Sequence, residues 1–406
     1  MQILKTHNKI YLQLFSLIII FLISGSLLVN IFLGVTAIYF FYLMKNNSIK
    51  FNKDYFWPLI IIYAYLIFNS ILSIDPIISG QRNIFFLRFF CLILILAFFF
   101  EKFDQFFLKI SIFWIVILII LSLDIIYQGY FGYNILGYKT SSPTRNSSFF
   151  FSELKAASII NGLGFLSLTI IYHFRQKKFI ALSILLIFLA ATFVTGERSN
   201  FLKFLIMASV FLFLLMGRKN LKITFFTLFT FLTISFLTLI FTSNNIMKRF
   251  QTSTSYKDKN DNIIQIYKYS QWGAHAYTAF EIFKDNRLFG VGNKNFRIAC
   301  TEYQKIIVDK YNIQPRGCST HPHQLYYELI SEHGLIGTVI IFSSLFYLIF
   351  KRLSKPMNKI NYISLTYILV TFIPLLPSGS FFTTYNATLF SLNFGFFLYN
   401  SHNKST

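Results

Sequence analysis

Charged residues are scarce in this 406-residue chain, and acidic residues are the scarcest. Aspartate and glutamate together number 15, all charged residues make up 13% of the sequence, and hydrophobic residues make up 55%. Soluble domains carry roughly 25% charged residues, so this composition excludes an ordinary water-soluble protein. Long runs rich in phenylalanine, isoleucine and leucine are present instead, and runs of about 18 or more apolar residues span membranes. The composition therefore predicts a polytopic membrane protein.

Signals for several other classes are absent as well. The first apolar run lacks a small-residue cleavage site and is followed directly by a second run, so we expect no cleavable signal peptide. No internal repeat is visible, which counts against a repeat-built flippase or transporter. One long polar segment contains four histidines without the close spacing of a zinc site, so we expect no metal. These histidines are His275, His321, His323 and His333.

Twelve apolar runs are candidate membrane-spanning helices, which predicts an all-α fold. They cover residues 10–25, 27–44, 55–74, 83–100, 107–127, 152–173, 179–195, 200–217, 222–242, 334–350, 360–377 and 381–399. With the amino terminus in the cytoplasm, six of the seven inside segments carry more Lys and Arg than Asp and Glu. This agrees with the positive-inside rule and places both termini inside. We therefore interpret the net charge of +22 as a signal of orientation and expect no nucleic-acid partner.

The candidate spans divide the chain into three parts. Residues 1–242 hold nine predicted helices, residues 243–333 form one large external loop, and residues 334–406 hold three more helices and a cytoplasmic tail. A loop this long in a compact protein is usually functional. We therefore expect the chemistry of the protein to lie in this loop.

The loop ends in the stretch CSTHPHQLYYELISEHGLIG, which starts at Cys318. A proline suits the first turn of a helix, and a serine or threonine before it can cap the helix. A helix that starts at Pro322 and ends or bends at Gly334 directs His323 toward whatever the loop encloses. The alternative is that His321 and His323 are interfacial side chains with satisfied hydrogen bonds.

Several arginines lie at external helix ends, against the positive-inside tendency. Arg82 stands where the fourth candidate span begins, Arg88 lies six residues further along that span, Arg198 precedes the eighth span, and Arg145 lies in an external segment. An arginine at the bilayer centre costs on the order of 2.5–3.5 kcal/mol, and less near the interface. Snorkelling to lipid phosphates is one explanation. The other is a cationic pocket for a phosphorylated ligand, because the planar guanidinium makes bidentate contacts with phosphate. Together with the histidines, the arginines favour a lipid-linked pyrophosphate.

These motifs together resemble the O-antigen ligase family, which shares a domain with the O-antigen polymerases. The likeness is carried by RLFGVGNKNF followed by STHPHQLYYELISEHGLIG, by GERSN around Arg198, and by about twelve spans with one late external loop. His323 is followed by ten residues and Gly334, as in the family pattern. Gln324 stands where the family usually has asparagine, and Arg287 stands where proline is common. Lys268 is a possible match to a basic residue that precedes a tryptophan.

The resemblance implies a multi-pass glycosyltransferase of the bacterial inner membrane that acts in lipopolysaccharide biosynthesis, with its active site facing the periplasm. The donor would be a glycan on undecaprenyl pyrophosphate, and the acceptor would be lipid A core or another glycan. No cofactor or metal is expected, and the absence of a DxD motif fits a lipid-linked donor. The membrane lipids surround the spans, which would accommodate the polyprenyl tail.

The predicted chemistry assigns a role to each candidate residue. A neutral histidine is a suitable base for an acceptor hydroxyl, so His323 is the predicted general base, and His321 orients or replaces it. Arg198, Arg82 and Arg88 are predicted to bind the pyrophosphate. Lys268 is a further predicted substrate contact, and Glu328 is predicted to orient a histidine or the acceptor, with helix-surface solvation as the alternative for Glu328.

Three alternatives remain open at this point. An O-antigen polymerase would use the same donor with a second lipid-linked glycan as acceptor, and a protein O-oligosaccharide ligase would use a protein. A glycolipid flippase would move the lipid without chemistry. The cysteines give a separate prediction: Cys300 and Cys318 share the external loop, where a disulfide can persist. Such a bridge would stabilise the fold by roughly 3 kcal/mol in the chain-entropy model, whereas Cys91 is expected only to pack inside a span.

Overall fold

The computed structural model describes residues 2–49, 53–139, 144–151, 153–217, 267–313 and 315–399. These residues form helices joined by turns and loops, and no β-strand occurs among them. The first half contains α1 (Gln2–Ser16), α2 (Ile18–Ser24), α3 (Ser26–Lys45), α4 (Lys53–Ile71), α5 (Pro76–Ile84), α6 (Leu87–Lys102), α7 (Asp104–Phe131), η1 (Ser148–Phe150), α8 (Ala156–Ile159), η2 (Ile160–Gly164), α9 (Phe165–Arg175), α10 (Lys178–Val194) and α11 (Arg198–Met216). The second half contains α15 (Gln271–Asp285), α16 (Phe296–Tyr311), α17 (Leu325–Leu353), α18 (Lys359–Thr371) and α19 (Thr384–Leu398).

Eight helical segments of the described residues are long and apolar enough to cross a membrane, which confirms the predicted all-α membrane class. They are His7–Ser24, Ser26–Lys45, Lys53–Ile71, Pro76–Lys102, Asp104–Phe131, Ala156–Arg175, Arg198–Met216 and Leu325–Leu353. The predicted count of twelve is not confirmed. The candidate span 222–242 lies outside the described residues, and three others appear as shorter helices, namely α10, α18 and α19.

Local sequence signals explain where several helices begin. The Asp75 carboxylate caps α5 by accepting hydrogen bonds from the amides of Ile77 and Ile78, with Pro76 in the first turn. Asn358 forms a capping box at the start of α18, and the Thr383 hydroxyl caps α19. Short polar side chains at these positions satisfy helix amides that have no partner within the helix.

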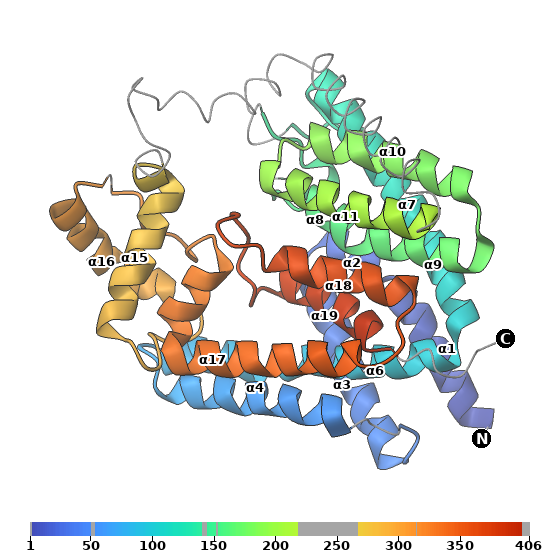
Figure 1. The fold of residues 1–406 in the computed structure, drawn as a ribbon, viewed down its shortest axis with the longest axis horizontal. Helices are drawn as coiled ribbons and strands as arrows, with labels where there is room; N and C mark the ends of the chain where they lie inside the picture. The colour runs from blue at the N-terminus through green and yellow to red at the C-terminus, as the bar shows by residue number, and fades with distance from the viewer. Residues whose placement is uncertain are drawn as a thin grey trace.

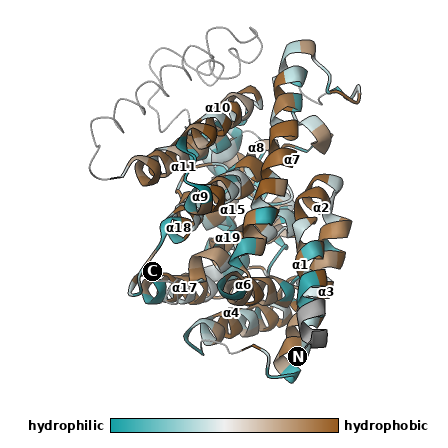
Figure 2. Ribbon diagram, turned by 90° about the vertical axis from the view of Figure 1, so that its right-hand side faces the viewer, coloured by the Kyte–Doolittle hydropathy of each residue, from teal (hydrophilic) through white to brown (hydrophobic). Residues whose placement is uncertain are grey.

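The core lies around α19, whose residues from Thr384 to Leu398 are nearly all buried. This helix packs between α6 and α18 in the centre of the bundle (Figure 1). Its apolar residues are therefore surrounded by protein, and a helix of 15 residues need not reach both membrane surfaces. Long stretches of the peripheral helices are coloured as hydrophobic in Figure 2, and Leu27, Ile38 and Trp57 on these helices are exposed. Such exposed side chains suit contact with lipid tails.

Segments that the charge pattern assigns to one membrane side meet at one end of the bundle. Lys351 and Asp54 form an ion pair of 3.3 Å, and the Lys359 ammonium lies 4.5 Å from the ring centroid of Tyr172. The Arg352 guanidinium donates to the carbonyl of Tyr399, which ties the end of α17 to the end of α19. In Figure 1 this end is on the right, and α15 and α16 are at the opposite end. Asp54, Lys351 and Lys359, which belong to predicted inside segments, thus lie at the same end of the bundle as the last turns of α9.

Candidate functional site

A cluster of three imidazoles and one indole lies where the residues before α17 pack against α15. The ring centroids of His321 and His323 are 4.1 Å apart, and those of His275 and His323 are 5.0 Å apart. Trp272 contacts His323 edge-on, with 5.5 Å between the ring centroids. The structure thus brings the two predicted histidines together and adds His275, which the sequence analysis weighed only as a metal ligand.

Residues 317–321 are held against α15 and α16 by covalent and polar contacts. Cys300 on α16 and Cys318 form a disulfide, with their Cα atoms 5.0 Å apart. The Nδ1 atom of His275 lies 3.2 Å from the carbonyl oxygen of Gly317. A Cβ atom at Gly317 would lie 2.1 Å from the Thr278 hydroxyl, so only glycine permits this close approach. Residues 317–321 are therefore fixed in place by α15 and α16.

The predicted helix start at Pro322 is wrong. Helix α17 begins at Leu325, and the side-chain oxygen of Gln324 caps it by accepting from the amide of Tyr327. His323 precedes the helix and has a φ of 55°, a left-handed conformation that is uncommon for residues other than glycine. This turn separates His323 from the helix axis and lets its ring meet those of His321 and His275. Gly334 bends α17 as predicted, with a φ of 62°.

The environment of the histidines favours their neutral forms. Burial lowers the pKa of His321 to about 4, assisted by the nearby positive charge of Lys294 and, more weakly, of Arg297. Burial lowers the pKa of His323 to about 3, and its histidine neighbours act in the same direction. Burial also lowers the pKa of His275. All three imidazoles are therefore unprotonated at neutral pH and available as proton acceptors.

The ring nitrogens of the pair differ in their surroundings. Nδ1 of His321 lies 3.0 Å from the Thr320 hydroxyl, and its Nε2 is buried without a hydrogen-bond partner among the described residues. His323 is partly exposed. Neither of its ring nitrogens is among the buried, unpartnered nitrogens of the described residues. Of the two, His323 is the better placed to meet a hydroxyl that arrives from solvent.

A buried charge cluster lies directly behind the histidines. The Lys294 ammonium is 3.3 Å from Oε1 of Glu328, and the Ser380 hydroxyl hydrogen-bonds to both groups. The amide of Phe381 donates to Oε2 of Glu328 at 2.9 Å. Lys294 and Glu328 are 3% and 1% exposed, so the Glu328 carboxylate is fully engaged inside the protein. Sequence reasoning placed Glu328 among substrate contacts and did not single out Lys294 or Ser380.

The glycine-rich turn of the GVGNKNF motif docks onto the bend in α17. The amides of Val291 and Gly292 donate to the carbonyls of Ser331 and Glu332, both at 2.9 Å. A Cβ atom at Gly334 would lie 2.5 Å from the carbonyl carbon and oxygen of Leu288. The two motifs that carry the family resemblance are thus one packed unit, in which glycine is required for close backbone approach.

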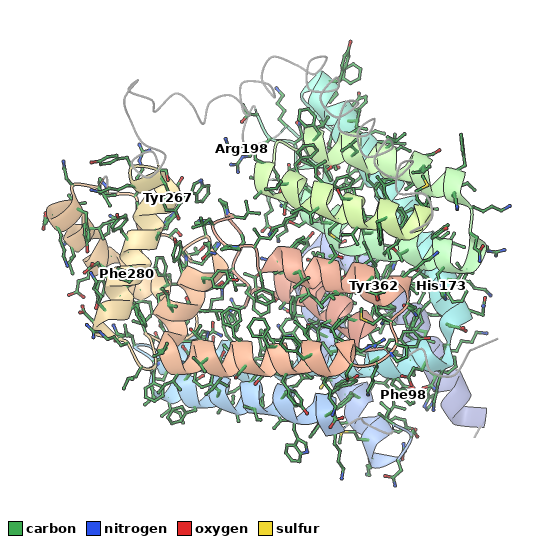
Figure 3. The ribbon with its side chains drawn as sticks, viewed as in Figure 1. Phe98, His173, Arg198, Tyr267, Phe280 and Tyr362 are labelled. Carbon is green, nitrogen blue, oxygen red and sulfur yellow. A yellow bond between two sulfur atoms is a disulfide. The ribbon has the colours of Figure 1, made fainter. Side chains whose placement is uncertain are left out.

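The predicted phosphate-binding arginines have different surroundings. Arg88 donates from Nη2 to the side-chain oxygen of Asn30 at 2.9 Å and lies 5.1 Å from the ring of Phe89. Arg82 is exposed at the end of α5. Arg198 is partly exposed at the first position of α11, at the end of that helix nearer α15 (Figure 3). Lys268 is partly exposed, and its ammonium lies 5.3 Å from the ring of Tyr269.

A second arginine accompanies Arg198. The amide of Asn146 donates to the carbonyl of Thr195, which docks the external segment onto the turn before α11. A Cβ atom at Gly196 would lie 2.3 Å from the carbonyl oxygen of Thr144, so this docking is tight and brings Arg145 beside the turn. Burial lowers the pKa of Arg145, with Glu197 opposing this and Arg198 reinforcing it. Burial raises the pKa of Glu197 to about 7.

Residues 378–385 form hydrogen bonds with His323, with the buried charge cluster, with Asn30 beside Arg88, and with Lys155 near Glu197. The amide of Ser378 donates to the carbonyl of His323 at 2.8 Å, and Ser380 belongs to the buried charge cluster. The Thr384 hydroxyl donates to Oδ1 of Asn30, the same atom that Arg88 contacts. The Tyr385 hydroxyl donates to the carbonyl of Lys155. Two residues after Lys155, the amide of Ala157 donates to the Glu197 carboxylate. The sequence prediction placed residues 378–380 in a short link and residues 381–385 at the start of the last candidate span, and it assigned no role to either.

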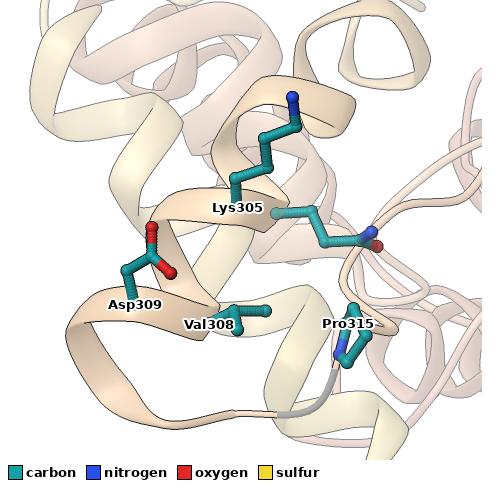
Figure 4. A pocket seen from close by; sticks show the side chains of 5 residues that line it. Lys305, Val308, Asp309 and Pro315 are labelled. Atoms are coloured by element: carbon teal, nitrogen blue, oxygen red, sulfur yellow. The ribbon is translucent and has the colours of Figure 1, made fainter.

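Two other features contribute nothing to this cluster. A surface pocket of about 350 Å³ lies over α16 and contains none of the predicted site residues (Figure 4); it is lined by Gln304, Lys305, Val308, Asp309 and Pro315. Among the described residues, no group of three or more His, Cys, Asp or Glu side chains is arranged to hold a metal ion. The histidine cluster with its charged support is therefore the best candidate site.

Fold and site together define a helical membrane protein with a neutral histidine pair at one end of its bundle. Residues 182–342 match the family model described as O-Antigen ligase, a range that includes Arg198, the glycine-rich turn and the histidine motif. The chain therefore carries an O-antigen ligase domain, which confirms the family resemblance and supports a function of the ligase or polymerase type. The search of curated proteins found no match.

Proposed function

We propose that this protein transfers a glycan from undecaprenyl pyrophosphate to a lipid A core acceptor at the periplasmic face of the bacterial inner membrane. In this proposal residues 243–333 are the periplasmic loop that carries the catalytic motif, between the helices of 1–242 and 334–406. The observation that carries it is the pair of neutral imidazoles, His321 and His323, which lies within the matched domain of residues 182–342.

The proposed reaction is a direct displacement at the anomeric carbon. His323 takes the proton from the acceptor hydroxyl while the hydroxyl oxygen forms the new bond to that carbon. The bond between the carbon and the pyrophosphate oxygen breaks, and undecaprenyl pyrophosphate leaves with the electron pair. Attack from the face opposite the leaving group inverts the configuration. His321 supports or replaces His323, and the proton on the imidazole passes to solvent after product release.

The arginines suit the leaving group of this reaction. Negative charge develops on the pyrophosphate oxygen, and fixed cationic donors stabilise charge that forms in the transition state. We assign this role to Arg198 and Arg88, with Arg82 and Lys268 as further contacts at the entrance. A pyrophosphate that is already a good leaving group needs no general acid, and the reaction as written needs no metal or cofactor.

The test is a defined transfer reaction. Purified protein in lipid vesicles is given an undecaprenyl-pyrophosphate glycan and lipid A core, and the products are identified by mass spectrometry. Glycosylated lipid A core supports the proposal. A lengthened lipid-linked glycan identifies a polymerase, a glycosylated protein acceptor identifies a protein ligase, and movement of the lipid across the vesicle without a covalent product identifies a flippase.

A substitution ties the activity to the site. We expect His323→Ala to lower the rate by on the order of 10²–10⁴-fold, the usual contribution of a general base. His173→Ala is the matched control, because His173 lies in the last turn of α9 at the opposite end of the bundle. Near-normal turnover in His323→Ala, with the protein still monodisperse in detergent, would assign the base elsewhere.

A further inference from the structure

Lys294 occupies a position that a lysine rarely adopts. Its φ is 67°, in the left-handed region, and its side chain is 3% exposed. A buried ammonium is costly unless it is paired, and a side chain at positive φ is strained. Strain and a buried charge at one residue persist only where surrounding contacts fix them, and such residues concentrate at functional sites.

The neighbouring asparagines fix the backbone at Lys294. The amide of Asn293 donates to the side-chain oxygen of Asn69 at 3.0 Å, and the side-chain amide of Asn295 donates to the Ser79 hydroxyl at 2.7 Å. Both asparagines are fully buried. Helices α4 and α5 therefore hold the turn from both sides and direct the Lys294 side chain toward α17 and the stretch 378–385.

A continuous chain of contacts runs from the Lys294 ammonium to His323. The ammonium contacts the Glu328 carboxylate and the Ser380 hydroxyl, and Glu328 also accepts from the amide of Phe381. Two residues before Ser380, the amide of Ser378 donates to the carbonyl of His323. A displacement of Lys294 would therefore loosen the segment that holds the left-handed turn at His323.

We propose that Lys294 is a positioning residue for the histidine pair, which holds residues 378–381 against His323 through its contacts with Glu328 and Ser380. Its positive charge also disfavours a proton on His321. This inference rests on the proposed function for its catalytic meaning. The groups that face His321 are consistent with it: Lys294 and Arg297 are cationic, and His275 and His323 are the other titratable neighbours. Within the pair, His323 is the ring on which a carboxylate acts, because Glu328 opposes the effect of burial on its pKa.

The charges around Lys294 decide which variants are informative. Glu328 and Glu332 on α17 both face it, and His333 also senses its charge. Lys294→Met alone leaves Glu328 buried without its cation, a change that commonly unfolds proteins. The double variant Lys294→Met with Glu328→Gln removes both charges of the pair and is expected to fold. Lys294→Arg keeps the charge and serves as the conservative variant.

The first measurement is the pH dependence of transfer by the double variant. We expect kcat to fall by about tenfold or more. The acidic limb, which reports His323, should not move to higher pH, because Glu328 raises the pKa of that ring and its charge is removed in the double variant. Lys294→Arg should restore kcat toward the wild-type value. Wild-type kcat in the double variant would reduce Lys294 to a structural ion pair and overturn the proposal.

The second measurement does not depend on transfer activity. Diethyl pyrocarbonate modifies neutral imidazoles, and peptide mass spectrometry reports the extent of reaction at each histidine as a function of pH. We expect the midpoint for His321 to rise in the double variant and that for His173 to stay constant. An unchanged His321 midpoint contradicts the proposal. If the wild type transfers no glycan, the proposed function fails, and this measurement still tests the charge of Lys294.

Discussion

Acidification is the perturbation that tests the candidate site most directly. An imidazole with the ordinary pKa of about 6.5 is only ~3% neutral at pH 5. With the pKa of His321 lowered to about 4 and that of His323 to about 3, the two rings stay ~90% and ~99% neutral at that pH by the same relation. A lowered pKa keeps the base unprotonated at more acidic pH. The transfer rate at pH 5 should therefore be roughly 90% of the rate at pH 7.5 or higher.

The assay is single-turnover transfer with saturating acceptor, followed from pH 8 to pH 4. The donor is a pyrophosphate diester, which carries no group that titrates in the upper part of this range. Return of acid-treated protein to pH 7.5 before assay separates reversible protonation from unfolding. A reversible loss of rate with a midpoint near 6.5, about thirtyfold at pH 5, would show that the reacting base is an ordinary solvated histidine and would refute the assigned site.

Three further predictions test the scaffold around the site. Gly334→Ala places a Cβ 2.5 Å from the Leu288 carbonyl at a φ of 62°; we expect a loss of more than about 1–2 kcal/mol, measured by thermal unfolding in detergent, and an unchanged melting temperature would contradict the packing described. Cys300→Ser removes the disulfide and should cost roughly 3 kcal/mol, with the wild type approaching the variant once it is reduced; equal denaturation midpoints of oxidised wild type and variant would rule this out. Gly196→Ala conflicts with the Thr144 carbonyl in the turn that precedes Arg198. It should raise the donor KM about tenfold with the acceptor KM unchanged, because Arg198 is assigned to the pyrophosphate; steady-state kinetics that show no donor effect would count against Arg198 in the donor site.

The apolar runs predict the peripheral helices well because their signal is continuous in sequence. The run at 27–44 is α3, and the run at 107–127 lies within α7. The run at 83–100 is less simple, because α5 ends at Ile84 and α6 begins at Leu87. No glycine or proline lies at this break, so hydropathy alone predicts one continuous helix there. Helix α18 ends at Thr371, earlier than predicted, and prolines at 374 and 377 follow it.

In the candidate site too, the features carried by neighbouring residues could be predicted, and the contacts between distant residues could not. His321 and His323 could be found because they form a motif of adjacent residues, and the disulfide because both cysteines lie in one loop. The helix start was misplaced because Gln324, an uncommon capping residue, supplies the cap in place of a serine or threonine. Lys294 and Ser380 are 86 residues apart, so only the folded structure shows that they meet.

In the proposed reaction, positive charge acts on both the base and the leaving group. Lys294 and Arg297 disfavour a proton on His321, and the assigned arginines favour the developing pyrophosphate anion. A proton therefore reaches the base most readily when negative charge is forming on the leaving group, since each charge then compensates the other. Removal of a cation should consequently make the free base easier to protonate and the leaving group harder to expel. These two effects appear separately, the first as a higher pKa of His321 and the second as a lower rate at neutral pH, so histidine modification and kinetics together can assign each cation its share in the chemistry.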